Sequence, residues 1–98
     1  MIEPAETSEL MAFLRTADAR SVSRAAQELG LPRATISRRL ARLEERLGVR
    51  LLRRTTRSLS LTDAGEAVYA NARMALDAVQ PAEDSVRRDD NKLRGALR

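Results

Sequence analysis

The residues of this chain whose types and spacing could do chemistry are arginines, concentrated in one segment. Between Leu31 and Arg57 there are nine arginines and only two acidic residues, Glu44 and Glu45. This segment therefore carries a net charge of +7, whereas the whole chain carries +4. A guanidinium group is a rigid fork of donors that suits paired hydrogen bonds with phosphate or with guanine. The pattern therefore indicates an acidic polymer as the partner. The nine arginines are Arg33, Arg38, Arg39, Arg42, Arg46, Arg50, Arg53, Arg54 and Arg57.

The composition excludes several other kinds of chemistry. The 98 residues include no cysteine and no histidine, so disulfides, zinc fingers, thiol catalysis and histidine acid–base chemistry are excluded. Because no spaced carboxylate pair suggests a cleft, we predict no enzymatic activity, no metal and no cofactor. Phe13 and Tyr69 are the only aromatic residues, which disfavours stacking on single-stranded DNA or RNA. No apolar run of membrane length and no signal segment is present, so we expect a cytoplasmic protein that does not contact membranes.

The arginine segment itself predicts a helix. Apolar residues recur at helical spacing, and Gly48 supplies a stop, so we expect the helix to run from about Arg33 to Leu47. Small residues at its front would let the backbone approach a groove. A plain solvated surface helix is the alternative, because charge runs usually face water. The apolar stripe consists of Ile36, Leu40, Leu43 and Leu47, and the small residues are Ala34, Thr35 and Ser37.

Two further helices are predicted upstream. The first should begin after a cap at Thr7 or Ser8, because Pro4 discourages an earlier start. The second should cover residues 22–29, with Ser21 as its cap and Gly30 as its stop. A short helix, a tight glycine-bearing turn and a longer basic helix are typical of the helix-turn-helix arrangement. An ordinary helical hairpin in a small bundle is the alternative.

The segment after Gly48 predicts a two-stranded hairpin. Leu51, Leu52, Leu59 and Leu61 flank a polar, arginine-bearing stretch, and residues 59–61 alternate between apolar and polar. A basic hairpin beside a recognition helix is a wing, whereas the alternative is a surface turn with incidental charge.

A last helix is predicted from Thr62 onward, with acidic residues in its first turn. A stripe of small apolar residues follows, which suits packing between two copies of the chain or packing on the chain's own domain. Pro81 should kink or stop this helix. The predicted dimerisation residues are Val68, Ala72, Ala75 and Val79.

Three stretches resemble the N-terminal DNA-binding domain of the LysR-type transcriptional regulators. They are S-V-S-R-A-A-Q-E-L-G (residues 21–30), I-S-R-R-L-A-R-L-E-E-R-L-G-V-R-L-L-R-R-T (residues 36–55) and R-S-L-S-L-T-D-A-G (residues 57–65). The resemblance implies a mainly α fold: a winged helix-turn-helix of three helices plus a two-stranded wing in residues 1–61, followed by a long linker helix in residues 62–90 through which two subunits dimerise. Residues 91–98 close on G-A-L-R, which resembles the opening of the family's effector domain. We therefore expect an excised DNA-binding fragment whose small-molecule effector would bind only in the missing domain.

The resemblance also implies roles for individual residues. Residues at the front of the third helix would approach base edges and nearby phosphates, residues of the wing would touch the backbone and the minor groove, and the start of the second helix would face a phosphate. These candidate DNA-binding residues are Ser21, Ser23, Arg33, Ala34, Thr35, Ser37, Arg38, Arg42, Arg54, Thr55 and Arg57.

The predicted function is sequence-specific binding of double-stranded DNA by a homodimer on an interrupted palindromic site, in the cytoplasm at the bacterial nucleoid. The alternative is a basic helical module that binds an acidic protein partner or DNA non-specifically. Such a module would bind a duplex no better than any polyanion, heparin for example.

Overall fold

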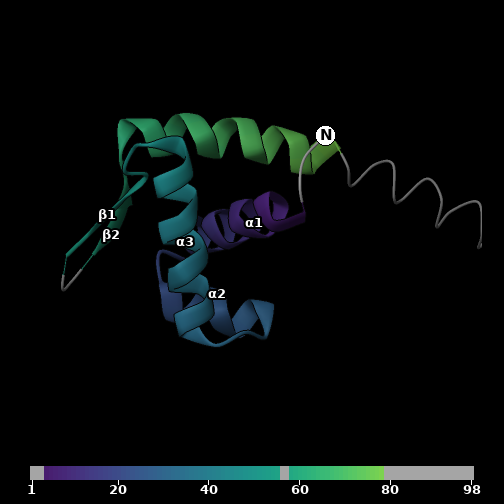
Figure 1. The fold of residues 1–98 in the computed structure, drawn as a ribbon, viewed down its shortest axis with the longest axis vertical. Coiled ribbons are helices and arrows are strands. Elements are labelled where there is room, and N and C mark those ends of the chain that lie inside the picture. Colours follow the sequence, from purple (N-terminus) through teal and green to yellow (C-terminus); the bar gives the residue numbers. More distant parts are fainter. Residues whose placement is uncertain (1–3, 56–57, 79–98) are drawn as a thin grey trace, which may run out of the picture.

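The computed structural model describes residues 4–55 and 58–78 (Figure 1). It contains α1 (Pro4–Ala19), α2 (Val22–Leu29), α3 (Arg33–Leu47), β1 (Leu52–Arg54) and β2 (Leu59–Leu61). A fourth helix covers residues 63–78. The predicted mainly helical fold with a two-stranded wing is confirmed. The predictions that concern Arg57, Val79, Pro81 and residues 91–98 fall outside the described residues.

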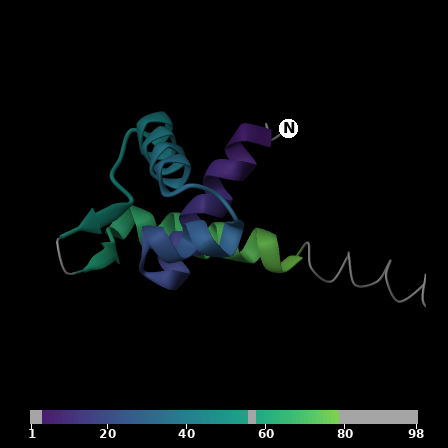
Figure 2. The same ribbon diagram turned by 90° about the horizontal axis from the view of Figure 1, so that it is seen from below.

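The first three helices pack around one core, and α3 lies in front of α1 with α2 against its N-terminal half (Figures 1 and 2). The side chains of Phe13, Ile36, Leu40, Leu43 and Leu51 are fully buried there. The fourth helix lies across the C-terminal end of α3, and the hairpin projects away from the three helices (Figure 1). The core thus holds α3 with one face inward and the opposite face open.

The predicted start of the first helix at Thr7 or Ser8 was wrong, because α1 begins at Pro4. Proline is well suited to the first helical position, where its missing N–H would have no partner in any case and its fixed φ is already helical. Pro4 therefore starts this helix instead of delaying it. The helix ends at Ala19, which leaves Ser21 free to cap the second helix as predicted.

The bounds of the second helix are as predicted. The Ser21 hydroxyl oxygen accepts a hydrogen bond from the Arg24 N–H at 3.1 Å, which satisfies one of the free donors of the first turn. Gly30 ends the helix with φ at 67°, in the left-handed region that glycine adopts without a steric penalty.

The third helix also ends at a left-handed glycine, Gly48, with φ at 70°. Ile36, Leu40 and Leu43 are buried as predicted, but the prediction that Leu47 belongs to the buried stripe was wrong, since 42% of it is exposed. The last turn of α3 reaches past the core, and Leu47 lines an open groove beside the fourth helix.

The hairpin pairs antiparallel strands, with Leu52 opposite Leu61 and Arg54 opposite Leu59. Leu52 is buried whereas Arg54 is exposed, so the leucines anchor the base and the arginines project with the wing. Near the tip the Thr55 N–H donates to the Ser58 carbonyl at 2.8 Å, and the Ser58 N–H donates to the Thr55 hydroxyl at 2.9 Å.

Hydrogen bonds of two residues, Glu44 and Thr62, join the wing and the fourth helix to the three-helix core. The Glu44 carboxylate, on the last turns of α3, accepts the N–H of Leu51 at 2.8 Å and that of Leu52 at 3.2 Å. The Thr62 N–H donates to the Leu51 carbonyl at 3.0 Å, and the Thr62 hydroxyl accepts the Gly65 N–H at 3.0 Å. Thr62 therefore caps the fourth helix, as predicted.

Candidate nucleic-acid interface

The turn between α2 and α3 fixes the angle at which α3 is presented. Gly30 is followed by Leu31, whose N–H donates to the Ala26 carbonyl at 3.0 Å, and this closes the end of α2. Ala25 and Ala26 are buried, and their small side chains allow a close approach of the helices. The result is a rigid helix-turn-helix unit.

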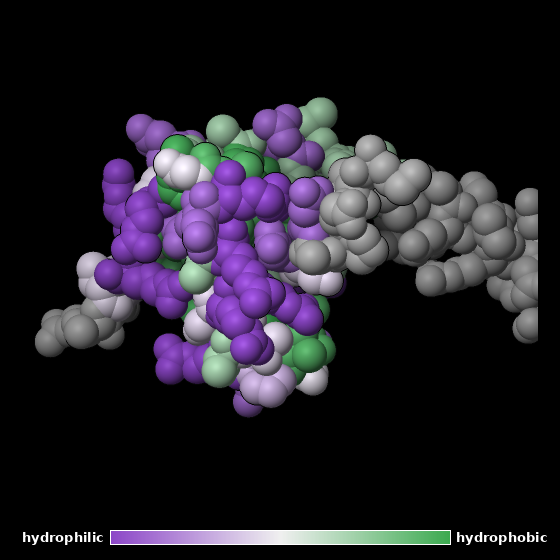
Figure 3. Space-filling model, viewed as in Figure 1, coloured by the Kyte–Doolittle hydropathy of each residue, from purple (hydrophilic) through white to green (hydrophobic). Residues whose placement is uncertain are grey.

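The open face of α3 carries most of the predicted interface residues. Arg33, Ala34, Arg38 and Arg42 are exposed, and Thr35 and Ser37 are half-buried beside them. Figure 3, which has the same viewpoint as Figure 1, shows hydrophilic side chains over most of this face. Within residues 4–55 and 58–78, none of these arginines forms an ion pair with a carboxylate. Their positive charge is therefore available to an external anion.

Two of the nine arginines in the basic segment, Arg46 and Arg50, pair with carboxylates of the chain itself. The Arg46 guanidinium donates to the Glu9 carboxylate of α1 at 2.9 Å and lies 3.9 Å from that of Glu6. Arg50 lies 3.6 Å from the Glu44 carboxylate. The Arg46 pairs hold the last turn of α3 against α1. The unpaired positive charge of α3 therefore lies toward its N-terminal part, and the exposed Arg53 and Arg54 of the wing add to it.

A hollow of about 210 Å³ lies between the start of α2, the start of α3 and the wing. Three arginines and four hydroxyl residues line it, and none of its described lining residues is acidic. The Ser21 oxygen already accepts the Arg24 N–H, which leaves the hydroxyl proton free to donate outward. This chemistry fits a phosphate group. The predicted interface residues that meet here are Ser21, Ser23, Arg33, Arg54 and Thr55.

Three of the residues predicted to take part in dimerisation line one groove of about 410 Å³ between α1, α3 and the fourth helix: Val68, Ala72 and Ala75. Val68 also packs against the core of its own chain. Ala75 is exposed, and the neighbouring Met74 is 69% exposed. The groove is thus an apolar surface on the side away from the wing.

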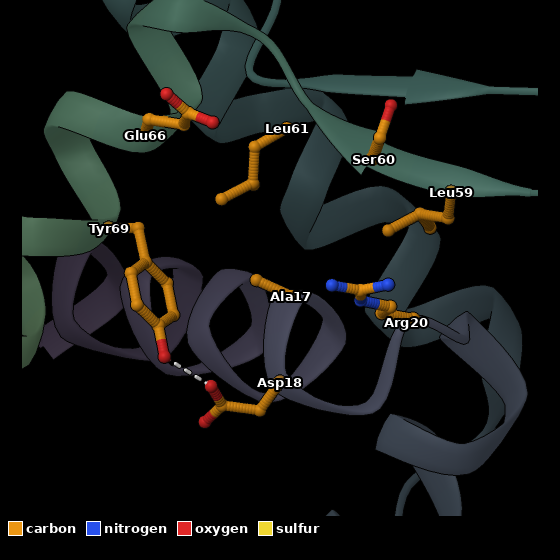
Figure 4. Close-up of a pocket in the computed structure, with 8 residues that line it drawn as sticks. All are labelled: Ala17, Asp18, Arg20, Leu59, Ser60, Leu61, Glu66 and Tyr69. Carbon is orange, nitrogen blue, oxygen red and sulfur yellow. Dashed lines mark hydrogen bonds between the residues drawn. The ribbon is translucent and has the colours of Figure 1, made fainter.

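A cluster that sequence reasoning missed joins the end of α1 to the fourth helix. Asp18 accepts hydrogen bonds from the Tyr69 hydroxyl and from Arg73, whose guanidinium carbon lies 5.6 Å from the centre of the Tyr69 ring. The neighbouring Tyr69 and Asp18 side chains raise the pKa of Arg73 above its ordinary value, because both favour the charged guanidinium. The cluster borders a second hollow, of about 470 Å³ (Figure 4). No local pattern could have revealed it, since Asp18 and Tyr69 are 51 positions apart.

Sequence reasoning also missed the positions of Glu44 and Arg20. Glu44 was counted only as a charge, whereas it orients the wing. Arg20 lines both hollows. Over the described part of the chain, no group of acidic side chains could hold a metal ion. No helix in that part is long and apolar enough to cross a membrane.

Comparisons with known proteins agree with this geometry. The profile of the family described as "Bacterial regulatory helix-turn-helix protein, lysR family" matches residues 7–66. An HTH-type transcriptional repressor of Pseudomonas aeruginosa is 47% identical over 75 residues, which cover 76% of this chain and 24% of the repressor. The chain therefore spans about a quarter of the length of that curated relative.

Solved structures show the same likeness. The BenM DBD in its complex with catB site 1 DNA superposes with a TM-score of 0.78 at 30% identity, over 85% of this chain and 92% of that one. The CbnR DBD in its DNA complex superposes with a TM-score of 0.74 at 35% identity, over 84% of this chain and 94% of that one. The chain belongs to the LysR family of bacterial regulatory helix-turn-helix proteins.

Proposed function

We propose that this chain is the part of a transcriptional regulator that binds double-stranded DNA and reads its sequence. The observation that carries the proposal is the open face of α3, where Arg33, Arg38 and Arg42 are exposed without a carboxylate partner in the described residues. The names of the relatives, which are regulators of transcription, support it. So do the DNA complexes of BenM and CbnR. Binding of this kind needs no catalytic group, and we propose no enzymatic role.

In this proposal α3 enters a major groove and the wing follows the flanking minor groove. Side chains from Arg33 to Arg38 supply the sequence preference, with Ala34, Thr35 and Ser37 allowing close approach. The remaining candidate residues contact the backbone and the minor groove: Ser21, Ser23, Arg42, Arg54, Thr55 and Arg57. A protein with this function works on the chromosome, so a cytoplasmic location at the nucleoid follows from the proposal.

The test is a salt titration of binding to two duplexes of equal length. One is a palindromic duplex selected from random sequence, and the other is its scrambled version. Binding to the selected duplex should be tighter by about a thousandfold or more, with a steep dependence on salt. Equal affinity for both duplexes and for heparin would instead establish the basic interaction module.

Replacing Arg38 with alanine should weaken binding to the selected duplex by about 1 to 3 kcal/mol and relax the preference at one base position. The reason is that a paired guanidinium contact with a base edge is lost. Fluorescence anisotropy on a set of single-base variants of the duplex measures both effects. Arg15→Ala, at an exposed position on α1, is the control for loss of one charge. Equal weakening by Arg38→Ala on the selected and scrambled duplexes would contradict the base-reading role.

We also propose that a second copy of the chain covers the apolar groove and that residues 62–90 act as the dimerisation segment. This proposal is supported by the position of Val68, Ala72 and Ala75 along one groove, which the exposed Leu47 also lines. Two copies related by a two-fold axis would read an interrupted palindrome.

An Ala75→Asp substitution should then shift the chain from dimer to monomer in sedimentation velocity, because it buries a carboxylate in the interface. Ala70→Asp is the matched control, since Ala70 is exposed on the same helix but does not line the groove. A dimer that tolerates Ala75→Asp as well as Ala70→Asp would contradict the proposed interface.

A further inference from the structure

Arg20 occupies a backbone conformation that arginine rarely adopts. Its φ is 54°, and it is the one non-glycine residue with positive φ in the described part of the chain. The other two helix ends with such a conformation use glycine, Gly30 after α2 and Gly48 after α3. A β-carbon in the left-handed region crowds the following carbonyl, so arginine costs free energy there and glycine does not.

No ion pair or hydrogen bond of the Arg20 side chain within the described protein compensates for this cost. Arg20 is exposed, and within residues 4–55 and 58–78 its guanidinium forms no ion pair. By contrast, the arginines that hold the fold together, Arg46 and Arg73, each have a carboxylate partner. A strained residue whose side chain is free points to a partner outside the chain.

Arg20 lies between two hollows with different linings. The larger one is lined by Glu66 and by Asp18, which is paired with Arg73, whereas the smaller one is lined by Arg33 and Arg54 and has no carboxylate among its described lining residues. In Figure 4 the Arg20 guanidinium extends below strand β2 toward the larger hollow. In the absence of an anion, repulsion from Arg33 and Arg54 favours this orientation. An anion in the smaller hollow would attract the Arg20 guanidinium and favour the opposite orientation.

From these observations we infer that Arg20 is a further phosphate-binding residue, which turns toward the hollow of Ser21, Arg33 and Arg54 and binds one phosphate of the DNA backbone. The inference rests on the proposed DNA binding and adds a residue to it. Because every duplex presents the same phosphates, the contact strengthens binding to all sequences alike. The left-handed backbone at Arg20 then lowers the stability of the chain, while the Arg20 side chain raises its affinity for DNA.

The test uses the whole chain with three substitutions: Arg20→Gly, Arg20→Ala and the control Arg15→Ala. Binding is measured by salt titration on the selected and the scrambled duplex, and stability is measured as Tm without DNA. Arg20→Gly and Arg20→Ala should both weaken binding about threefold to tenfold on either duplex, and reduce the salt slope by about one. Arg20→Gly alone should raise the Tm by about 4 °C or more, because it relieves the strain. Arg15→Ala should change neither quantity.

An unchanged affinity and salt slope in Arg20→Gly, with a wild-type chain that still prefers the selected duplex, would overturn this inference and leave the proposed function intact. Weakening on the selected duplex only would also overturn it, since that result indicates a base contact. A wild-type chain that does not distinguish duplex from heparin would overturn the proposed function, and this inference with it.

Discussion

Replacing Gly65 with alanine is expected to lower the free energy of unfolding by about 3 kcal/mol or more. A β-carbon at Gly65 would lie 2.0 Å from the Leu51 carbonyl oxygen, far inside van der Waals contact. Neither partner can move easily, because the Leu51 oxygen accepts the Thr62 N–H at 3.0 Å and the Leu51 side chain is fully buried. The fourth helix would have to withdraw from the base of the wing.

Gly30→Ala is the matched control for this substitution. Position 30 also favours glycine, but only because its φ of 67° is left-handed, since nothing lies within 4 Å of an added β-carbon there. Its replacement should cost only about 1 kcal/mol. Chemical denaturation followed by circular dichroism measures both values. If the two variants lose equally little stability, the close approach at Gly65 is not a constraint on the fold.

Removing the Glu44 carboxylate is expected to cost about 3 kcal/mol, since Glu44→Ala leaves two backbone N–H groups without an acceptor. These are the N–H groups of Leu51 and Leu52, two residues whose side chains are buried at the base of the wing. The Glu44 side chain is only 12% exposed. Because this carboxylate sets the direction in which β1 leaves α3, the variant should also bind the selected duplex more weakly than its remaining folded fraction explains.

Glu45→Ala provides the control for Glu44→Ala. Glu45 is the adjacent residue, carries the same charge and is exposed, so its loss should change the stability by less than about 0.5 kcal/mol. Glu44→Gln keeps one oxygen acceptor and should fall between the two. Thermal melts together with anisotropy on the selected duplex give both readouts. Equal stability of Glu44→Ala and Glu45→Ala would show that the hydrogen bonds to Leu51 and Leu52 do not hold the wing.

The sequence alone predicted the elements whose signals are local. Ser21, Gly30 and Gly48 act within one helical turn of their position, so the bounds of α2 and the end of α3 could be predicted from the neighbouring residues. The alternation at residues 59–61 likewise marked β2. The start of α1 was misjudged because proline has opposite effects inside a helix and at its first residue, and the sequence pattern did not distinguish them.

The concentration of arginine and the absence of cysteine and histidine were also visible in the sequence, and they led to the acidic class of partner that we propose. Only the tertiary structure decided which arginines are free. Arg46 pairs with Glu9 across 37 positions, whereas Arg33 and Arg54 meet at one hollow although they belong to different elements. Such contacts depend on how helices and strands pack, and no local period or cap encodes them. For the same physical reason the close approach at Gly65, the role of Glu44 and the placement of Arg20 emerged only from the fold.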